Sequence, residues 1–494
     1  MEMNILVDEK EMKDIDSYSI HTAGIPSLEL MERAAAAVAD CVEQSIHVQD
    51  RILAVCGSGN NGGDGVAAAR ILKNRGYQAD VLYCGSREHA SAENREQIRR
   101  AELSGVAIYD NIALEEYTVI VDAVFGIGLS RPLEGKYREL AEQINGSGLP
   151  VFAVDIPSGI HGGSGLTLGT AIRATETITF GYEKTGLVLY PGREYAGKVT
   201  VADIGFSPEG EKRVNPACFT YGREDISRLP ARPAYSNKGT FGRVLVIAGS
   251  KTISGAAYLS AAGAYRMGAG LVRVLTRPEN RTILGTLLPE ALLDTYENPV
   301  LEEQKILDAL SWASAVVIGP GIGRDQTAED LVELVISRVL VPIVIDADAL
   351  YFLNGPIPDQ AILTPHLKEM AALAGTSVQD IAGDLRGTAW RFTKNNGGIL
   401  VLKDAATLVA NGQRMYINKS GCSGMATGGS GDVLTGILAG LLAQGMEPFD
   451  AACLGVYLHG SAGEAAAGQK TEYCMMASDI IELLPRIIKE SINQ

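Results

Sequence analysis

Basic charge is scarce in this chain of 494 residues, which has 43 Lys and Arg residues against 59 Asp and Glu residues and a formal net charge of −16 at pH 7. Binding to nucleic acid or to an anionic membrane requires a basic face, so the charge argues against either as the main partner. A local anion site is not excluded, because backbone N–H groups at the start of a helix can bind an anion without side-chain charge.

The sequence also lacks paired cysteine motifs and long apolar stretches. Its seven cysteines are odd in number and scattered, with no C-x-x-C spacing, which favours reduced buried thiols over a disulfide framework. The longest mostly apolar stretch, 433–443, is far shorter than the roughly 18–20 residues that span a bilayer. The acidic beginning MEMNILVDEKEMKDID has no apolar core of a signal peptide. We therefore expect a soluble, cytoplasmic protein that does not enter a membrane.

Glycine, in contrast, is abundant, with 56 residues. Short β-branched runs alternate with Ala-rich stretches of helical length in both halves of the chain, a pattern typical of βαβ units and a parallel sheet. In the first half, a helix at 27–44 precedes strands expected at 51–56, 79–83, 118–124, 150–155, 175–180 and 198–203. In the second half, strands are expected at 243–248, 271–276, 315–318, 342–345, 361–363 and 399–402. A hairpin is expected at 407–409 and 414–417, with its turn at Asn411-Gly412.

The alternation stops across 207–235, a charged stretch that contains four prolines. We therefore place a linker at 213–232, between a first domain at 1–212 and a second domain at 233–494. The chain has no internal repeat, and its two halves share no motif. The sequence thus predicts two unlike α/β domains joined in one chain.

The strand expected at 51–56 is followed by GSGNNGGDG at 57–65 and then by a helical stretch. The glycines satisfy the G-x-G-x-x-G pattern of dinucleotide-binding loops, but the acidic residue that this fingerprint requires about twenty residues later is missing. The generic pattern does not need Asn60, Asn61 and Asp64. These side chains indicate contact with a ligand or a cation, or else they serve only the geometry of the turn and the helix start.

Two further strands are expected to end in polar residues. One ends at Asp122, before AVFGIGLSRP, and the other ends at Asp155, before Ile-Pro-Ser-Gly. Because the carboxyl ends of parallel strands lie at one edge of a sheet, Asn61, Asp122 and Ser158 can converge there. Their oxygen atoms suit a hard cation rather than zinc, and no His or Cys joins them.

In this order and spacing, GSGNNGGDG, VDAVFGIGLSRP and VDIPSG closely resemble the NAD(P)H-hydrate epimerase domain, over about residues 4–206. The resemblance implies a Rossmann-like, doubly wound parallel sheet and a potassium ion (K⁺) held by Asn61, Asp122 and Ser158. It implies that the hydrate is bound by Asn60, Asn61, Gly62, Gly63, Asp64, Gly126, Ile127, Gly128, Leu129, Ser130, Arg131, Pro132 and Asp155. The reaction inverts C6 of the nicotinamide ring, which bears a hydroxyl beside the ring nitrogen, and reversible acid–base chemistry suffices for it. We expect Asp155 to be the catalytic carboxylate, or else only to hold the ring or the ribose.

The stretch MATGGSGDVLTGILAGLLAQG at 425–445 is the most informative part of the second half. Gly428, Gly429 and Gly431 leave the backbone bare where a helix begins, so exposed N–H groups and the helix dipole form an anion site. Asp432 beside it can accept a proton from a hydroxyl that attacks a phosphoryl group. The simpler alternative for Asp432 is a helix cap, but a cap does not need G-G-S-G before it.

The G-x-G-D arrangement resembles the ribokinase-like kinases, and narrower motifs resemble the ADP- or ATP-dependent NAD(P)H-hydrate dehydratases over about residues 235–490. These motifs are KGTFGRVLVIAGS, SGAAYLSAAGAYRMGAGLV, GPGIG, DADAL, LTPHLKEMAAL, LKDAATLVA, MATGGSGDVLTG and MMASDI. The resemblance implies a ribokinase-like α/β domain that uses ADP or ATP with Mg²⁺, and it makes Asp432 catalytic. It assigns the hydrate to Ala256, Gly321, His366 and Asp432. It assigns the nucleotide to Lys403, Asp404, Ala405, Ala406, Thr407, Gly428, Gly429, Ser430 and Gly431.

Several single residues leave alternatives open. His366 follows an expected strand, where a ligand contact and a structural role are both possible. Lys403 is either a phosphate contact or a solvated strand end, and His459, on an apolar helix, is expected in the core. Asp346 and Asp348 follow a strand as paired acids, which either hold a metal or cap a helix.

Together the resemblances imply a multifunctional isomerase and lyase of metabolite repair. Its substrates would be the hydrates of NADH and NADPH with ADP or ATP, and dehydration of the S epimer would release phosphate and restore the reduced nicotinamide. An epimerase fused to such a dehydratase would convert the epimer that the dehydratase cannot accept into the one that it can. The rivals are a ribokinase-like vitamin-precursor kinase fused to a sugar- or nucleotide-binding domain and, for the first half, an interaction module. We expect a homo-oligomer; the choices between ADP and ATP, and between the two hydrates, stay open.

Overall fold

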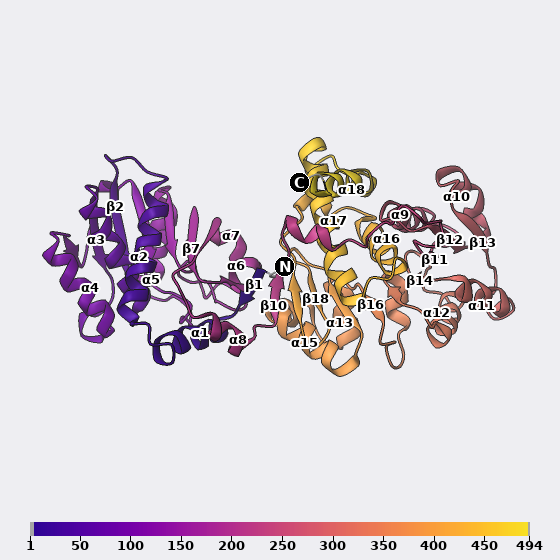
Figure 1. The fold of residues 1–494 in the computed structure, drawn as a ribbon, viewed down its shortest axis with the longest axis horizontal. Helices are drawn as coiled ribbons and strands as arrows, with labels where there is room; N and C mark the ends of the chain where they lie inside the picture. The colour runs from indigo at the N-terminus through magenta and orange to yellow at the C-terminus, as the bar shows by residue number, and fades with distance from the viewer. Residues whose placement is uncertain (1–3, 493–494) are drawn as a thin grey trace. The chain divides into compact units, whose positions relative to one another are not determined.

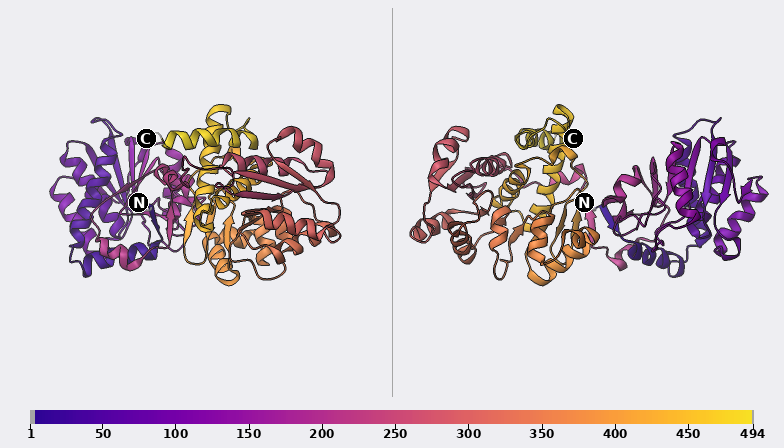
Figure 2. Two further views of the ribbon diagram at one scale, coloured as in Figure 1. Left: turned by 45° about the vertical axis from the view of Figure 1, so that its right-hand side comes forward. Right: turned by 180° about the vertical axis from the view of Figure 1, so that it is seen from behind.

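The computed structural model describes residues 4–492. They divide into two compact units, one formed by Ile5–Cys218 and the other by Asn4 and the residues from Phe219 onward. Both units are α/β, as the sequence predicts (Figure 1 and Figure 2). Among the described residues, no helix is long and apolar enough to cross a membrane.

The first unit contains a parallel sheet with the strand order β4-β3-β2-β5-β6-β7-β9. A separate parallel pair joins β1 and β8. The strands are β1 (Asn4–Val7), β2 (Arg51–Cys56), β3 (Gln78–Tyr83), β4 (Ile108–Tyr109), β5 (Val119–Ala123), β6 (Val151–Val154), β7 (Glu176–Phe180), β8 (Glu183–Lys184) and β9 (Lys198–Ala202). The helices are α1 (Glu9–His21), α2 (Ser27–Glu43), α3 (Asn60–Asn74), α4 (Ala92–Leu103), α5 (Lys136–Ser147), α6 (Thr185–Val188), α7 (Gly192–Ala196) and α8 (Pro208–Val214).

Helices cover both faces of this sheet, because its strands present apolar side chains to each face in turn. On β2, Ile52 and Ala54 pack with the apolar residues of α2, α3 and α4. The alternate residues Leu53 and Val55 pack on the other face with Ile144 of α5. This arrangement confirms the predicted Rossmann-like, doubly wound sheet.

The strand order of the first sheet reverses between β2 and β5. The chain runs from β2 outward to β3 and β4, and then returns to place β5 on the opposite side of β2. Open α/β sheets bind ligands at such a switch point, beyond the carboxyl ends of the strands. The start of α3 and the loop after β5, which contain most of the predicted epimerase residues, lie at this point.

The second unit has a sheet with the order β13-β12-β11-β14-β15-β16-β17-β18-β19-β10. Its pairs are parallel from β13 to β17 and antiparallel from β17 to β19. The strands are β10 (Cys218–Thr220), β11 (Arg243–Ile247), β12 (Leu271–Thr276), β13 (Leu292–Thr295), β14 (Ala315–Ile318), β15 (Ile343–Ile345), β16 (Ala361–Leu363), β17 (Ile399–Leu402), β18 (Leu408–Ala410) and β19 (Met415–Ile417). The helices are α9 (Gly255–Arg266), α10 (Arg281–Leu287), α11 (Glu303–Trp312), α12 (Gln326–Arg338), α13 (Leu367–Ala374), α14 (Val378–Gly383), α15 (Leu385–Asn396), α16 (Ser430–Ala443), α17 (Pro448–Lys470) and α18 (Ala477–Ile492).

Helices α9 and α16 lie against each other backbone to backbone, because both consist largely of Gly and Ala at their contact. A Cβ at Gly436 would lie 2.1 Å from Ser260 O, and a Cβ at Gly440 would lie 2.9 Å from Ala264 O. Gly436 and Gly440 are four residues apart on α16, and their partners Ser260 and Ala264 are four residues apart on α9 in the same order. The two helices therefore run in the same direction. Their amino-terminal ends therefore lie together.

The predicted strands are present, most within one or two residues of the expected bounds. β12, β14, β16 and β17 have the expected ranges, and β18 and β19 form the expected antiparallel hairpin. Five strands and helix α1 were not predicted from the sequence; the strands are β1, β4, β8, β10 and β13. The five strands are only two to four residues long, too short for a clear alternation. α1 is mostly polar and buries only Met12, Ile15 and Ser19.

The chain enters the second unit at Phe219, inside the segment 213–232 where a linker was expected. β10 and the following short 3-10 helix (Arg223–Arg228) place Phe219, Tyr221 and Ile226 in the core of that unit. The Phe219 ring centroid lies 5.7 Å from that of Tyr416 and 6.2 Å from that of Phe449. These aromatic contacts link the start of the second unit to β19 and α17.

We predict that Phe219→Ala destabilises the second unit by about 3–5 kcal/mol, the usual cost of removing a buried Phe side chain. Both tryptophans of the chain, Trp312 and Trp390, lie in this unit. Urea unfolding followed by tryptophan fluorescence therefore reports on it in the full-length chain. Tyr235→Ala is the control, because Tyr235 is fully exposed and is expected to change stability by less than about 0.5 kcal/mol. Equal midpoints for both variants would mean that β10 is not part of the core.

Candidate active sites

Backbone contacts that only glycine permits hold the loop after β2. Gly57 donates its N–H to Ala123 O at 3.0 Å, and a Cβ at Gly57 would lie 2.1 Å from Val124 O. A Cβ at Gly62 would lie 1.9 Å from Gly57 O. The loops after β2 and β5 are therefore in direct contact, and α3 begins at Asn60 beside them.

Asn94, on α4, also fixes the loop after β2. Its buried side-chain amide donates to Gly57 O at 3.0 Å and to Gly59 O at 2.7 Å. The Tyr83 hydroxyl donates to Asn94 Oδ1 at 3.3 Å. The sequence analysis did not single out Asn94, because nothing local marks a helical Asn as the partner of a distant loop.

The structure brings Asp122 and Ser158 together at the ends of β5 and β6. Ser158 Oγ donates to Asp122 Oδ1 at 2.6 Å, and the Ser158 N–H donates to Oδ2 at 2.8 Å. Burial raises the pKa of the Asp122 carboxyl to about 6, although the hydrogen bonds from Ser158 lower it. Asn61 Oδ1 lies beside Gly126 in the loop after β5, and Asn61 Nδ2 is buried with no hydrogen-bond partner in the described chain.

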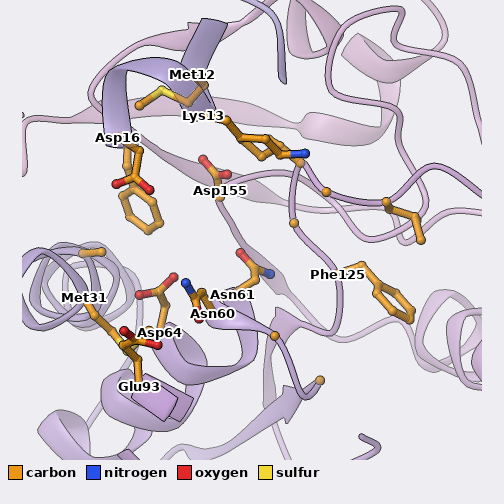
Figure 3. A pocket seen from close by; sticks show the side chains of 18 of the residues that line it. Met12, Lys13, Asp16, Met31, Asn60, Asn61, Asp64, Glu93, Phe125 and Asp155 are labelled. Carbon is orange, nitrogen blue, oxygen red and sulfur yellow. The ribbon is translucent and has the colours of Figure 1, made fainter. Parts of the chain in front are cut away.

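A cavity of about 610 Å³ lies at the switch point of the first sheet. Asn60, Asn61, Asp64, Asp155 and the loop residues 126–131 line it, and Figure 3 shows the labelled acids and amides around one open space. Most of the residues predicted to bind the hydrate in the first unit therefore line this one cavity. Helix α1, which the sequence analysis missed, lines the cavity with Met12, Lys13, Asp16 and Ile20.

Some predicted contacts lie behind the cavity wall. Within the described chain, the lining does not include Gly62, Gly63 or Pro132. Gly62 packs on the backbone of Gly57, and a Cβ at Gly63 would lie 2.9 Å from Met31 Cε. These two glycines shape the loop and the start of α3 rather than face the cavity.

Asp155 forms a buried ion pair with a lysine that the sequence analysis missed. Lys184 Nζ lies 2.6 Å from Asp155 Oδ1, and the Lys184 side chain is only 1% exposed. The Thr179 hydroxyl donates to the same carboxylate oxygen at 3.1 Å. Asp155 adopts a left-handed backbone conformation with φ of 66°, which is strained for a residue with a Cβ and is typical of functional sites.

Two further acids share the cavity with Asp155. Burial first, and then the negative charge of Asp155, raise the pKa of Asp16 on α1. Burial, Asp155 and Asp16 together raise the pKa of Asp64 on α3 well above its ordinary value. The cavity therefore has several carboxyl groups and one fully buried cation, Lys184.

The second site lies at the start of α16. Gly429 precedes the helix with φ of 92°, a left-handed conformation that favours glycine, and the first-turn N–H groups of the helix are suited to an anion. A Cβ at Gly431 would lie 3.3 Å from Lys403 Nζ. The structure therefore brings together Lys403, at the end of β17, and Gly431, two of the predicted nucleotide residues.

Lys403 is held by Asp346, which lies at the end of β15 and is buried. Lys403 Nζ lies 2.9 Å from Asp346 Oδ1, to which the Thr364 hydroxyl also donates at 2.7 Å. The Thr435 hydroxyl of α16 donates to Oδ2 at 3.0 Å. Asp346 thus connects the ends of β15, β16 and β17 to α16. Its position after a strand in the sequence did not predict this role.

Asp432 lies in the first turn of α16. Burial first, and then the charges of Asp346 and Asp348, raise the pKa of its carboxyl to about 7, while Lys403 acts against them. Because α9 and α16 run side by side, Ala256 in the first turn of α9 is level with Asp432. A Cβ at Gly321 would lie 3.2 Å from Ala256 Cβ, so three of the four residues expected to bind the hydrate lie near one another.

The remaining candidates have clear structural partners. His366 Nδ1 caps α13 by accepting the backbone N–H groups of Lys368 and Glu369 at 3.1 and 3.2 Å, and its side chain is half-exposed. The backbones of His366 and Lys403 pair in an isolated parallel β-bridge. His459 is buried, as expected, with Nε2 3.0 Å from Ser430 O. Burial lowers the pKa of its imidazole to about 4.

Asp346 and Asp348 do not act as a pair. Asp348 accepts the Gly323 N–H at 3.0 Å and Arg324 Nε at 2.9 Å, whereas Asp346 binds Lys403. Within residues 4–492, no group of three or more His, Cys, Asp and Glu residues is arranged to hold a metal.

The geometry defines a class of protein: a two-unit α/β protein with a cavity at a Rossmann-like switch point in one unit and a glycine-rich helix start in the other. A family profile described as NAD(P)H-hydrate dehydratase matches residues 244–486, and one described as YjeF-related protein N-terminus matches residues 27–186. A ribokinase-like superfamily protein from Enterococcus faecalis, a solved structure, has a TM-score of 0.52 and 29% identity, over 56% of this chain and 96% of its own.

Two relatives match this chain over almost its whole length. The bifunctional NAD(P)H-hydrate repair enzyme of Moorella thermoacetica is 37% identical, over 98% of this chain and 96% of its own length. That of Escherichia coli is 35% identical, over 95% of this chain and 91% of its own length. The chain belongs to the family of bifunctional NAD(P)H-hydrate repair enzymes.

We predict that Gly62→Ala destabilises the first unit by about 1–3 kcal/mol, the usual cost of forcing extra atoms into a packed site, because the new methyl group would overlap Gly57 O. Gly59→Ala is the matched control in the same loop. A Cβ there meets nothing within 4 Å, and its φ of −82° is ordinary. Thermal unfolding followed by circular dichroism detects both units, and tryptophan fluorescence identifies the second one. Equal loss of stability in both variants would contradict the contact.

Proposed function

We propose that the first unit interconverts the R and S epimers at C6 of the hydrated nicotinamide of NADHX and NADPHX. The second unit then dehydrates the S epimer at the expense of ADP or ATP. The observation that carries the proposal is the place of Asp432, beside Lys403 and the bare backbone at the start of α16. Membership of the repair-enzyme family supports the pairing of the two activities.

The chemistry of dehydration explains the need for a nucleotide. Hydroxide is a poor leaving group, and phosphate is a good one. Asp432 takes the proton of the C6 hydroxyl as the hydroxyl oxygen bonds to the terminal phosphorus of the nucleotide, and the bond from that phosphorus to the nucleotide breaks. Loss of phosphate from C6 and of a proton from C5 then restores the reduced nicotinamide.

The raised pKa of Asp432, about 7, suits it to this role, because a general base acts best when its pKa is near the working pH. The N–H groups of Gly428, Gly429, Ser430 and Gly431 would bind the transferred phosphoryl group, and Lys403 would neutralise part of its charge. Mg²⁺ would accompany the phosphates of the nucleotide and draw charge from them.

For the first unit, we propose a potassium ion at Asn61, Asp122 and Ser158. The donors fit such an ion, because they are oxygen atoms of a carboxylate, a hydroxyl and an amide. Asn61 Nδ2 has no partner within the described residues, so the amide is free to turn its oxygen toward a cation. An ion bound there would neutralise the buried Asp122 and fix the two loops that line the cavity.

The other assignments are proposals of the same kind. The cavity-lining residues Asn60, Asp64, 126–131 and Asp155 would contact the hydrate in the first unit. Ala256, Gly321 and His366 would contact it in the second unit, and Asp404–Thr407 would contact the nucleotide. A cytoplasmic location, consistent with seven free cysteines, and a homo-oligomeric state stay predictions.

We predict that Asp432→Asn slows dehydration by roughly 10²–10⁴-fold, the range of general acid–base catalysis, and leaves epimerisation unchanged. The measurement is a progress curve on racemic hydrate with ADP and with ATP, followed by the absorbance of the restored ring. In the wild type, the rate rises with pH and levels off above about 7, because Asp432 must lose its proton to act as base.

Asp155→Asn is the reciprocal variant. The S epimer, which the dehydratase accepts, should disappear at the normal rate. The R epimer should disappear only as fast as it epimerises spontaneously, so the progress curve becomes biphasic. A monophasic curve would show that Asp155 is not catalytic. Normal dehydration by Asp432→Asn would rule out its role as base, and a stable phosphorylated product would favour the kinase alternative.

We predict that potassium stabilises the first unit most above pH 6. The pKa of the buried Asp122 carboxyl, about 6, is above its ordinary value of 3.8, so the unit loses stability as pH rises and this group ionises. A cation offsets that loss only where Asp122 is ionised. At a concentration ten times its dissociation constant, potassium would add about 1.4 kcal/mol to the free energy of unfolding of the first unit.

The measurement is the temperature at which the full-length chain loses half of its epimerase activity, in KCl and in choline chloride at equal ionic strength. Asp122→Asn should abolish the difference between the two salts and its dependence on pH. An equal potassium effect in this variant would place the ion elsewhere.

A further inference from the structure

Two acids of the first cavity lie in opposite electrostatic surroundings. Asp155 contacts Lys184, whose ammonium group also donates to Thr179 Oγ1 and Phe180 O, each at 2.9 Å. These three oxygens use all three N–H bonds of the ammonium group. Lys184 is therefore a fixed, buried partner of the Asp155 carboxylate.

Asp64 has the reverse environment. It faces the same cavity from α3, and no basic side chain in the described chain forms an ion pair with it. Burial and the negative charges of Asp155 and Asp16 raise its pKa well above the ordinary value. Its surroundings therefore favour the protonated form of Asp64, which lies in the first turn and a half of α3. Figure 3 shows Asp64 and Asp155 on two sides of the same open space.

The substrate carbon explains why an acid and a base are both useful. C6 of the hydrate carries a hydroxyl and is bonded to N1, so it is a hemiaminal. A hemiaminal inverts when its carbon–nitrogen bond opens to an aldehyde and closes again on the other face. Opening requires a base at the hydroxyl and an acid at the nitrogen. Two acids whose surroundings separate their protonation states are suited to these roles.

We propose that Asp155 and Asp64 are the base and the acid of a ring-opening epimerisation, and that Lys184 is the positioning residue that keeps Asp155 ionised. The proposal deepens the proposed epimerase function and rests on it. It assigns a role to Asp64 beyond substrate contact.

The step balances without any further reactant. Asp155 takes the C6 hydroxyl proton, the C6–N1 bond breaks with its electron pair going to N1, and N1 takes the proton of Asp64. C6 is then an aldehyde, and rotation about the C5–C6 bond turns its other face to N1. Asp64 takes back its proton as N1 attacks C6, and Asp155 returns its proton to the oxygen.

Asp16 is the competing candidate for the acid. It also faces the cavity with a raised pKa, but the positive charges of His21 and Lys184 oppose that rise. No such cation opposes the rise at Asp64. Asp64 is therefore the stronger candidate, and Asp16→Asn is the matched comparison, because it makes the same change at the same cavity.

The first experiment measures epimer exchange by the full-length chain without nucleotide, so that the dehydratase is silent. Asp64→Asn should lower kcat by about 10²–10⁴-fold with KM changed only a few-fold, and Asp16→Asn should lose much less. A normal kcat in Asp64→Asn, or the larger loss in Asp16→Asn, overturns the acid assignment. Absence of exchange in the wild type would instead refute the epimerase function itself.

The second experiment follows kcat/KM for exchange against pH in the wild type and in Lys184→Met. Loss of the cation should move the acidic limb, where Asp155 must be ionised, to higher pH, an effect that a purely structural lysine would not produce. The other titratable or charged groups at this cavity or beside the acids are Lys13, Asp16, His21, Cys56, Glu93, Arg131 and Tyr137. An unmoved limb in a folded Lys184→Met variant overturns the role of Lys184.

The third experiment needs no variant. The wild type epimerises the hydrate in water labelled with ¹⁸O, and mass spectrometry of the first-turnover product shows the origin of the C6 oxygen. Ring opening keeps the original oxygen on C6. Loss and re-addition of water replaces it, so one ¹⁸O atom for each inversion overturns the ring-opening path.

Discussion

Close approach of backbone to backbone, which only glycine allows, fixes both candidate sites. In the first unit, Gly57 and Gly62 bring the loops after β2 and β5 into contact, and a Cβ at either would lie about 2 Å from a carbonyl oxygen. In the second unit, Gly436 lets α16 lie on α9. The first contact places the amides and acids around the cavity, and the second places two helix starts together. Because a single methyl group would separate these segments, each site depends on the bare backbone beneath it.

The two sites also share an electrostatic design. In each, one aspartate is neutralised by a lysine and a second has no ion-pair partner among the described residues. The neutralised acids are Asp155 with Lys184 and Asp346 with Lys403. The other two, Asp64 and Asp432, have raised pKa values caused mainly by burial. A carboxyl group with a raised pKa can donate a proton to a substrate more readily near neutral pH than an ordinary surface Asp can.

The two chemistries complement each other in one chain. A site that phosphorylates a hydroxyl group must orient it toward the phosphorus, and this requirement selects one epimer of the hydrate. Epimerisation transfers no phosphoryl group, and beside the start of α3 its cavity presents several acids and a buried lysine. Spontaneous hydration of the ring is not restricted to the epimer that the dehydratase requires. The fusion of both units makes either epimer repairable.

The sequence by itself determined the α/β class, most strand bounds and the loops that carry the sites, because alternating apolar runs and glycine-rich motifs are local signals. It also indicated Asp155 and Asp432. Only the tertiary structure decided the partners of these acids. Lys184, Asp16 and Asn94 come from other strands and helices, and α1, which carries Asp16, is mostly polar with only three buried residues, Met12, Ile15 and Ser19. Their roles arise from desolvation and charge between segments distant in sequence, and such effects exist only once the chain has folded.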